Sequence, residues 1–198
     1  MKALDLFCGA GGASMGIHMA GFEVTGVDIK PQPHYPFKFI QADAMTFPLE
    51  GYDFIWASPP CQAFSPATLI HGKKHPNLLT STRERLKVTD TPWIIENVPG
   101  APMRADVVMC GSLIGQPRLK RHRLFEFWVP TLILLPSCSH ADEIVSVFGH
   151  GGHIYHKLDE WREVMGIDWM NRDELAQAIP PAYSHFLCRH VMQALTLT

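Results

Sequence analysis

Long apolar runs are absent from this sequence of 198 residues. A helix that crosses a membrane needs about 18 or more consecutive apolar residues, and the longest apolar stretch here, residues 127–135, is interrupted by Pro130. The apolar stretch at the N-terminus is also short, because Asp5 interrupts it and glycines follow, which argues against a secretory signal. We therefore expect no membrane partner and a cytoplasmic location.

Closely spaced cysteines are absent too. The number of cysteines is odd, and no two stand at Cys-x-x-Cys spacing: Cys8, Cys61, Cys110, Cys138 and Cys188. This pattern predicts neither a disulfide framework nor a zinc ribbon. A region rich in cysteine and histidine offers metal-binding side chains, but its spacings match no standard zinc template: Cys138, His140, His150, His153 and His156. The sequence predicts no metal site.

An overall excess of positive charge is lacking, because the formal net charge is −2. The charge is nevertheless uneven, since residues 71–87 and residues 118–123 each carry a local net charge of +4. Such segments either attract a polyanion or form ordinary solvated faces, and charge alone leaves both readings open. With 46% hydrophobic and 18% charged residues, the composition is that of a globular chain and excludes a disordered one.

Short apolar runs alternate with turns rich in glycine and proline through the first half of the chain. Strands are predicted over residues 2–7, 23–28, 37–40, 53–58, 93–96 and 123–129, and helices over 13–20, 159–165, 173–179 and 181–195. Strands separated by crossovers predict an α/β fold with a mostly parallel sheet. No repeat or linker is evident, so we expect one domain over residues 1–198.

The first candidate site is the segment Asp5–Gly12, DLFCGAGG, which runs from a strand through a glycine turn into a helix. Gly9, Gly11 and Gly12 would let the backbone approach a ligand closely. Asp28 closes the second strand, where a carboxylate can accept hydrogen bonds from a ribose. A nucleoside-containing cofactor and a purely structural turn both fit this pattern.

Two further candidates follow later strands. Cys61, after Pro60 in SPPCQAFS, lies in a stiff loop at the end of the fourth predicted strand and is either a nucleophile or a packed cysteine. Asp43 follows the third strand and either binds an adenine amino group or caps a turn.

Charged residues complete the set of candidates. Glu96 and Asn97 end the very apolar strand that begins at Trp93, where a carboxylate can have a raised pKa and act as an acid. Arg121 and Arg123 stand two apart in an extended segment and can bind carbonyl, carboxylate or phosphate oxygens.

DLFCGAGG, SPPCQ, ENV and RHR occur in this order, and the sequence thereby resembles the cytosine-5 DNA methyltransferase family. The resemblance implies a Rossmann-like, S-adenosylmethionine-dependent methyltransferase fold with a single doubly wound sheet. It implies S-adenosyl-L-methionine as cofactor and cytosine-containing duplex DNA as substrate, as in enzymes of restriction–modification or phage type.

The resemblance also assigns roles. Cofactor contacts are implied for Phe7, Gly9, Gly11, Gly12, Asp28, Ile29, Asp43, Ala44 and Gln177, and DNA contacts for Pro60, Gln62, Ser65, Lys73 and Lys74. Cys61 would add to carbon 6 of a flipped-out cytosine while Glu96 supplies a proton at nitrogen 3. Arg123, supported by Arg121, would hold the ring carbonyl, and Asn97 would brace the site.

The sequence departs from the family in three places. Leu119 stands where the family has Gln before the arginine motif, and Gln177 stands where it has Asn beside the cofactor. The third departure is the target-recognition region, which is reduced to residues 124–158. This short insert predicts either a recognition context of about one to three bases or a separate specificity subunit.

Two alternatives to DNA methylation remain. One is the same chemistry on RNA or on a free cytosine nucleotide, which would not need a long recognition region. The other is a catalytically silent regulator of a partner methylase. Retention of Cys61, Glu96 and both arginines favours an enzyme over the silent regulator.

Overall fold

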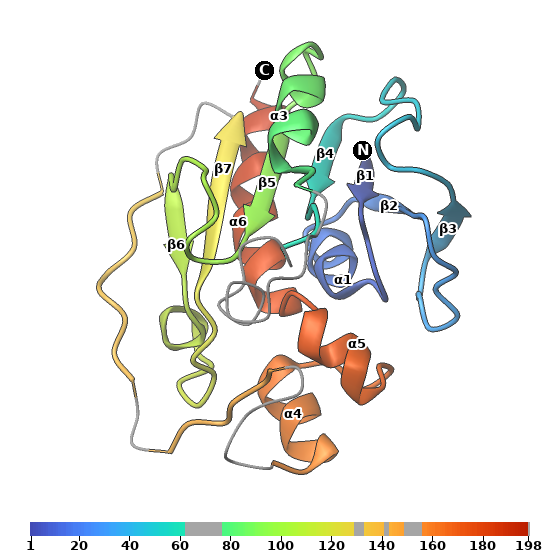
Figure 1. Cartoon of the computed structure of the whole chain (residues 1–198). Helices are drawn as coiled ribbons and strands as arrows, with labels where there is room; N and C mark the ends of the chain where they lie inside the picture. The colour runs from blue at the N-terminus through green and yellow to red at the C-terminus, as the bar shows by residue number, and fades with distance from the viewer. Residues whose placement is uncertain (62–76, 129–132, 141–142, 149–155, 198) are drawn as a thin grey trace.

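The computed structural model describes residues 1–61, 77–128, 133–140, 143–148 and 156–197. Within these residues, seven strands form one sheet of order β3-β2-β1-β4-β5-β7-β6 (Figure 1). Neighbouring strands from β3 to β5 pair in parallel, and β7 runs antiparallel to both β5 and β6. The strands are β1 (Lys2–Leu6), β2 (Glu23–Asp28), β3 (Lys38–Gln41), β4 (Phe54–Ala57), β5 (Trp93–Asn97), β6 (Val107–Met109) and β7 (Arg123–Trp128).

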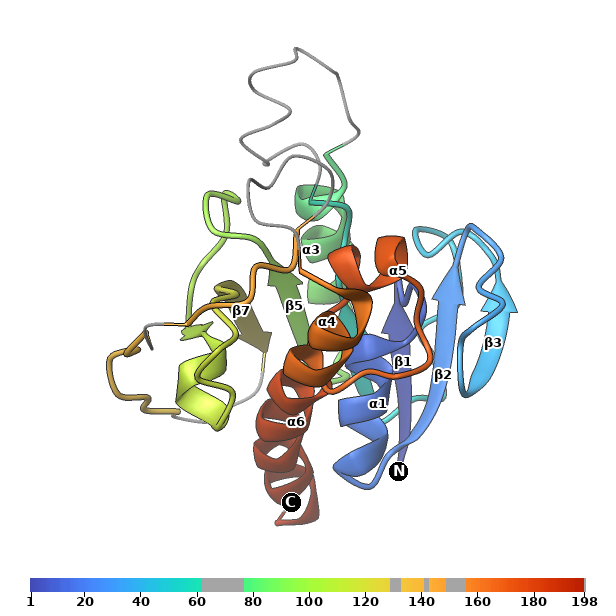
Figure 2. The same cartoon turned by 90° about the horizontal axis from the view of Figure 1, so that it is seen from below.

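Helices cover both faces of the sheet (Figure 2). Helices α1 (Gly12–Met19) and α6 (Pro181–Thr196) pack on one face, and α3 (Leu79–Lys87) packs on the other. Successive side chains of a strand point to opposite faces, and accordingly Trp56 belongs to the α1–α6 core while its neighbour Ile55 belongs to the α3 core. The expected doubly wound, mostly parallel α/β sheet is confirmed.

A third apolar cluster lies at the end of the sheet where the parallel strands finish. Helices α4 (Leu158–Met165) and α5 (Arg172–Gln177) supply part of it, together with Ala10 of the glycine turn and residues of the connecting segments. The indole Nε1 of Trp169 donates to the carbonyl oxygen of Ala10 at 2.9 Å. The C-terminal third of the chain therefore packs directly against the first predicted site.

The predicted elements are found with small shifts in their ends. Helix α5 stops at Gln177 rather than at residue 179, because Ala178 is already extended ahead of Pro180 and Pro181. Three elements were not predicted: α3, β6 and the short helix η2 (Gly111–Ile114). α3 buries only three of its nine residues, and β6 has only three residues, so neither carries a strong apolar pattern. Among the described residues, no helix is long and apolar enough to cross a membrane.

Candidate active site

The three motifs converge where β1, β4 and β5 end. The sheet places β1 beside β4 and β4 beside β5, so the glycine turn, the Pro-Pro-Cys loop and the Glu96–Asn97 strand end are neighbours. In open α/β sheets, ligands bind at this carboxyl edge. The structure therefore brings the three candidate motifs together at one edge of the sheet.

Asn97 fixes the start of the cysteine loop. Its side chain is fully buried, and its Nδ2 donates to the carbonyl oxygen of Pro59 at 3.0 Å. Its Oδ1 accepts from the backbone N–H of Val98, also at 3.0 Å. The Nδ2 end of the amide thus holds the loop against β5, and the Oδ1 end holds the turn that follows the strand.

The Cys61 thiol is partly exposed at the end of this loop. Burial of the thiol raises its pKa, and the nearby Glu96 carboxyl raises it further. The positive charge of Arg123, and more weakly that of Arg121, opposes this shift. The neutral thiol is therefore favoured in the free protein, and the arginines are the groups that stabilise a thiolate.

Glu96 and Arg123 form a buried ion pair with 3.0 Å between Oε1 and Nε. The pairing of β5 with β7 explains the contact, since Asn97 lies opposite Leu124 and Arg123 comes next. Burial raises the pKa of Glu96, while Arg123 and a hydrogen bond with Ser58 oppose that rise. Ser58 was not predicted as a site residue, although it directly precedes the Pro-Pro-Cys loop in the sequence.

Arg121 is engaged with the backbone. Its buried guanidinium donates to the carbonyl oxygens of Val147, Ala176 and Ala178 at 2.5, 2.7 and 3.0 Å. The hydroxyl of Tyr183 donates to the carbonyl oxygen of Arg121 at 2.7 Å. Burial lowers the pKa of Arg121 to about 9. The residue joins three segments of the chain. Its support of Arg123 and its part in catalysis stay predictions.

The glycine turn has the strained backbone that its sequence requires. Gly9 and Gly11 have φ of 49° and 85°, and Phe7 has φ of 60°. A side chain at Gly9 would meet nothing within 4 Å, so the open space lies on the solvent side of the turn. The Asp28 carboxylate accepts from the N–H groups of Gly9 and Lys30, both at 3.0 Å, and thereby holds the turn over the end of β2.

A buried polar group behind the turn was missed by sequence reasoning. Asp5 is fully buried, accepts from the hydroxyl of Ser14, and has no partner for its Oδ1 among the described residues. Burial raises its pKa to about 7. The phenol of Tyr35 contacts the Ser14 hydroxyl at 2.7 Å and packs against Gly11 and Gly26. An aspartate inside an apolar strand is the signal that could have identified Asp5.

The remaining predicted cofactor residues lie at the same edge in different settings. Ile29 exposes 65% of its surface, whereas Ala44 is buried. The Asp43 carboxylate accepts from the N–H of Met45 at 2.8 Å, the turn-capping role given as its alternative. Gly12 packs against the backbone of Ile179, so no side chain fits there. The Gln177 amide donates within α5, to the carbonyl of Asp173 at 3.3 Å.

Of the predicted DNA-contacting residues, Pro60 is described and partly buried. Gln62, Ser65, Lys73 and Lys74 lie outside the described residues.

Several basic side chains of the two charged segments are engaged internally. Arg83 forms a bidentate pair with Glu126 of β7, with both Nε and Nη2 at 2.9 Å from the carboxylate. Arg85 donates to the carbonyl oxygens of Ala44 and Phe47. These arginines hold α3 to the sheet and to the turn after β3, so the positive charge they offer to a polyanion is smaller than the sequence indicates.

The sequence matches a protein-family model and is similar to a curated methyltransferase. The sequence model of the C-5 cytosine-specific DNA methylase family matches residues 1–105. The Type II methyltransferase M.HgiDI of Herpetosiphon aurantiacus is 29% identical over 154 residues. That alignment covers 61% of this chain, and the chain spans about half the length of this curated relative (50%).

Two solved structures share the fold over nearly the whole chain. An Escherichia coli prophage protein described as a DNA modification methyltransferase has a TM-score of 0.66 at 15% identity, and 99% of each chain is covered. The methyltransferase EhMeth of Entamoeba histolytica has a TM-score of 0.59 at 12% identity, covering 100% of this chain and 99% of its own. At these identities the likeness concerns the fold alone.

The family match covers more than half of the chain and includes three of its predicted motifs. The glycine turn, the Pro-Pro-Cys loop and the Glu96–Asn97 strand end all lie within residues 1–105, and the structure brings them to one edge of the sheet. The protein therefore belongs to the C-5 cytosine-specific DNA methylase family.

Proposed function

We propose that this protein transfers a methyl group from S-adenosylmethionine to carbon 5 of cytosine in DNA, through a covalent adduct of Cys61 with a flipped-out base. The observation that carries the proposal is the buried Glu96–Arg123 pair beside Cys61. Carbon 5 of cytosine is a weak nucleophile. A thiol that adds to the ring, together with an adjacent acid and a cation, can activate it.

The glycine turn fits the cofactor. Space is open outside Gly9, and the Asp28 carboxylate at the end of β2 has lone pairs left to accept from ribose hydroxyls. The exposed apolar surface of Ile29 is suited to the face of an adenine ring. When bound there, S-adenosylmethionine supplies an electrophilic methyl group.

Activation of the base begins at Cys61. The partly exposed thiol gives its proton to solvent, and its sulfur forms a bond to carbon 6 of the ring. The electron pair of the 5,6 double bond forms a 4,5 double bond, and that of the 3,4 double bond moves to nitrogen 3, where the Glu96 carboxylic acid donates a proton. Carbon 5 thereby becomes nucleophilic and would take the methyl group, whose bond to the cofactor sulfur breaks. Burial raises the pKa of Glu96, so this carboxyl takes up a proton more readily than an exposed glutamate does.

Release of the product reverses the covalent step. Once carbon 5 carries the methyl group, its original proton leaves to solvent and the electron pair of that bond re-forms the 5,6 double bond. The sulfur–carbon bond breaks with its electron pair on sulfur, and nitrogen 3 returns its proton to Glu96. Arg123 stabilises the charge on Glu96 and on the ring carbonyl throughout. Asn97 keeps the cysteine loop at a fixed distance from β5 by its bond to Pro59.

A covalent trap tests the proposal. Duplex DNA containing 5-fluorocytosine, incubated with the protein and S-adenosylmethionine, should give a complex that survives denaturing electrophoresis, because fluorine cannot leave as a proton does. Cys61→Ser should form no such complex. Cys188→Ala, on the buried side of α6, should form it as the unchanged protein does. Trapping by Cys61→Ser would overturn the assignment of the nucleophile.

Labelled cofactor separates the alternative substrates. Transfer of label to duplex DNA, with little to single-stranded DNA, transfer RNA or deoxycytidine monophosphate, is the expected result. Transfer to RNA or the nucleotide alone would keep the mechanism and change the substrate. No transfer to any of them, with cofactor still bound, would favour the silent regulator.

The recognition context is expected to be short. The first residues of the predicted insert, up to Trp128, belong to β7 and are built into the sheet, which leaves fewer residues to read base edges. Each well-placed side chain discriminates a base by about 1–3 kcal/mol. Bisulfite sequencing of DNA treated with the protein alone should show a context of about one to three bases. A sharply defined longer site would contradict this, and activity that appears only with a second protein would identify a specificity subunit.

A further inference from the structure

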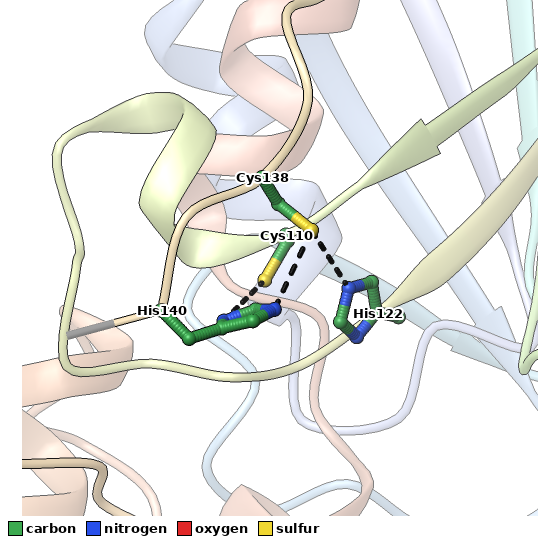
Figure 3. A group of neighbouring side chains, drawn as sticks. All are labelled: Cys110, His122, Cys138 and His140. Atoms are coloured by element: carbon green, nitrogen blue, oxygen red, sulfur yellow. Dashed lines mark hydrogen bonds between the residues drawn. The ribbon is translucent and has the colours of Figure 1, made fainter. Parts of the chain in front are cut away.

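Four metal-binding side chains meet at the edge of the sheet that carries β6 and β7 (Figure 3). Cys110 directly follows β6 and starts η2, and His122 directly precedes β7. Cys138 and His140 come from the described segment after β7 and are separated by one residue. Cys110 is buried, and Cys138 is exposed.

The separations between the donor atoms approach those of a tetrahedral site. Cys138 Sγ lies 3.4 Å from Nε2 of His122 and 3.4 Å from Nε2 of His140, and Cys110 Sγ lies 4.0 Å from Nδ1, the other nitrogen of the His140 ring. One ion would bind only one of these two nitrogens. One ligand atom from each of the four residues lies within 4.8 Å of all the others. Tetrahedral zinc, with bonds of about 2.0–2.3 Å, needs ligand atoms roughly 3.3–3.8 Å apart, so small side-chain shifts complete the site.

The donor set selects the metal. Two thiolates and two imidazoles are the Cys₂His₂ set of structural zinc sites, and soft sulfur ligands disfavour Mg²⁺ and Ca²⁺. Without a metal, the same atoms make only weak contacts, because thiols are poor hydrogen-bond donors and acceptors. The two imidazole rings also lie edge to face, with 5.3 Å between their centroids.

We infer that Cys110, His122, Cys138 and His140 bind one Zn²⁺ as a structural site. Binding releases the two thiol protons, so the two thiolates balance the charge of the ion and the histidines remain neutral. Four protein ligands close the coordination sphere, which leaves no position for water or substrate.

The site would position the arginine motif. His122 stands between Arg121 and Arg123, and the register of the sheet pairs Arg123 with Met109, the residue before Cys110. A metal at this point ties the segment containing Cys138 and His140 to the start of β7. It would thereby support Arg123 opposite Glu96 without touching the substrate.

Sequence reasoning missed this arrangement because the ligands come from three separate places along the chain. The prediction considered Cys138 and His140 together with later histidines and left out Cys110 and His122, which the sheet brings beside them. Of those later histidines, His156 is described and lies against Glu160, and His150 and His153 lie outside the described residues.

Metal analysis of the reduced protein, purified without chelator, tests the inference. We expect about one zinc per chain, retained through gel filtration. Cys138→Ser and His140→Ala should each lose most of it. Two matched controls away from the cluster, Cys188→Ala in α6 and His18→Ala on the exposed side of α1, should keep it.

The visible absorption spectrum of bound cobalt reports the ligand set without an activity assay. Protein stripped with chelator and loaded with CoCl₂ should show the intense visible bands of tetrahedral cobalt and a thiolate charge-transfer band. The charge-transfer band should fall by at least about half in Cys138→Ser, because one of the two thiolates is gone and the metal binds more weakly. Chelator should lower the melting temperature of the unchanged protein and leave that of His140→Ala unchanged.

Two results would overturn the site. One is protein that takes up no zinc or cobalt when supplied with either metal under reducing conditions. The other is metal content that is the same in Cys138→Ser and His140→Ala as in the unchanged protein. Either result leaves the proposed methyl transfer untouched, because the trap at Cys61 is measured separately.

Discussion

Glu96 and Arg123 form the ion pair on which the proposed activation of the base depends. Glu96→Gln removes the proton donor, and Arg123→Ala removes the cation that stabilises developing charge, so each should lower the single-turnover rate at least about 100-fold. Binding of S-adenosylmethionine should change little in either variant. Near-normal turnover by Glu96→Gln would mean that another group activates the ring nitrogen.

Arg121 should respond differently from Arg123, although only one residue separates them. Arg121→Ala leaves three carbonyl oxygens without their donor inside the protein. Losing these charge-assisted bonds should lower the free energy of unfolding by about 2–4 kcal/mol, measured by urea denaturation. Arg123→Ala should lower it by less, because Glu96 can take up a proton when its partner is removed and so leaves no buried charge unpaired. Equal stability losses in the two variants would contradict this division.

The pKa of Asp5 links stability to pH. It is about 7 in the folded protein and lies near 3.8 in an exposed carboxyl, so the folded state binds the proton more tightly than the unfolded state. The free energy of unfolding therefore falls as pH rises from about 4 to about 7, by about 1.4 kcal/mol per unit from this group. Asp5→Asn cannot titrate and should lack this part of the slope. Urea denaturation at several pH values compares the two, and parallel curves would contradict the assignment.

Helices α1 and α6 pack closely against each other at Gly16. A Cβ at Gly16 would overlap the carbonyl oxygen of Pro181 and the hydroxyl of Ser184. Helix propensity alone would make Gly16→Ala stabilising by about 1 kcal/mol, but the overlap should make it destabilising by about 1–3 kcal/mol. Met19→Ala, on the exposed side of the same helix, is the matched control and should be nearly neutral. A more stable Gly16→Ala protein would show that α6 can move away freely.

The elements differ in how well the sequence predicts them. β1, β4 and β5 are apolar runs that end in the motifs, so their location and the meeting of Cys61 with Glu96 follow from parallel-sheet rules. Contacts that depend on the register of β7 do not follow in this way. The Arg83–Glu126 pair and the proximity of Cys110 to His122 both arise from that register. No sequence pattern around one residue of either pair indicates its partner.

At the scale of the whole molecule, DNA binding depends on which basic side chains are not already paired with acidic ones. Arg83, Arg118 and Arg123 all pair with acidic residues of the protein itself, so phosphate contacts should depend on other basic residues, of which Lys73 and Lys74 are our candidates. The double variant Lys73→Ala/Lys74→Ala should weaken binding to all duplex sequences equally. It should also lower the slope of log affinity against log salt by up to about 2, measured by fluorescence anisotropy. An unchanged slope would exclude both lysines from phosphate contact.

The position of β7 between β5 and β6 has a consequence for the chain during its synthesis. β5 can pair with β4 as soon as both have left the ribosome, but its other side must wait for β7, and α6 arrives last of all. Until then the nascent chain presents β5 as an edge strand above an uncovered apolar face, the state in which strands from separate chains add to one another. A pause in translation after β6 would prolong this state, and chaperone capture of nascent chains should therefore be strongest there.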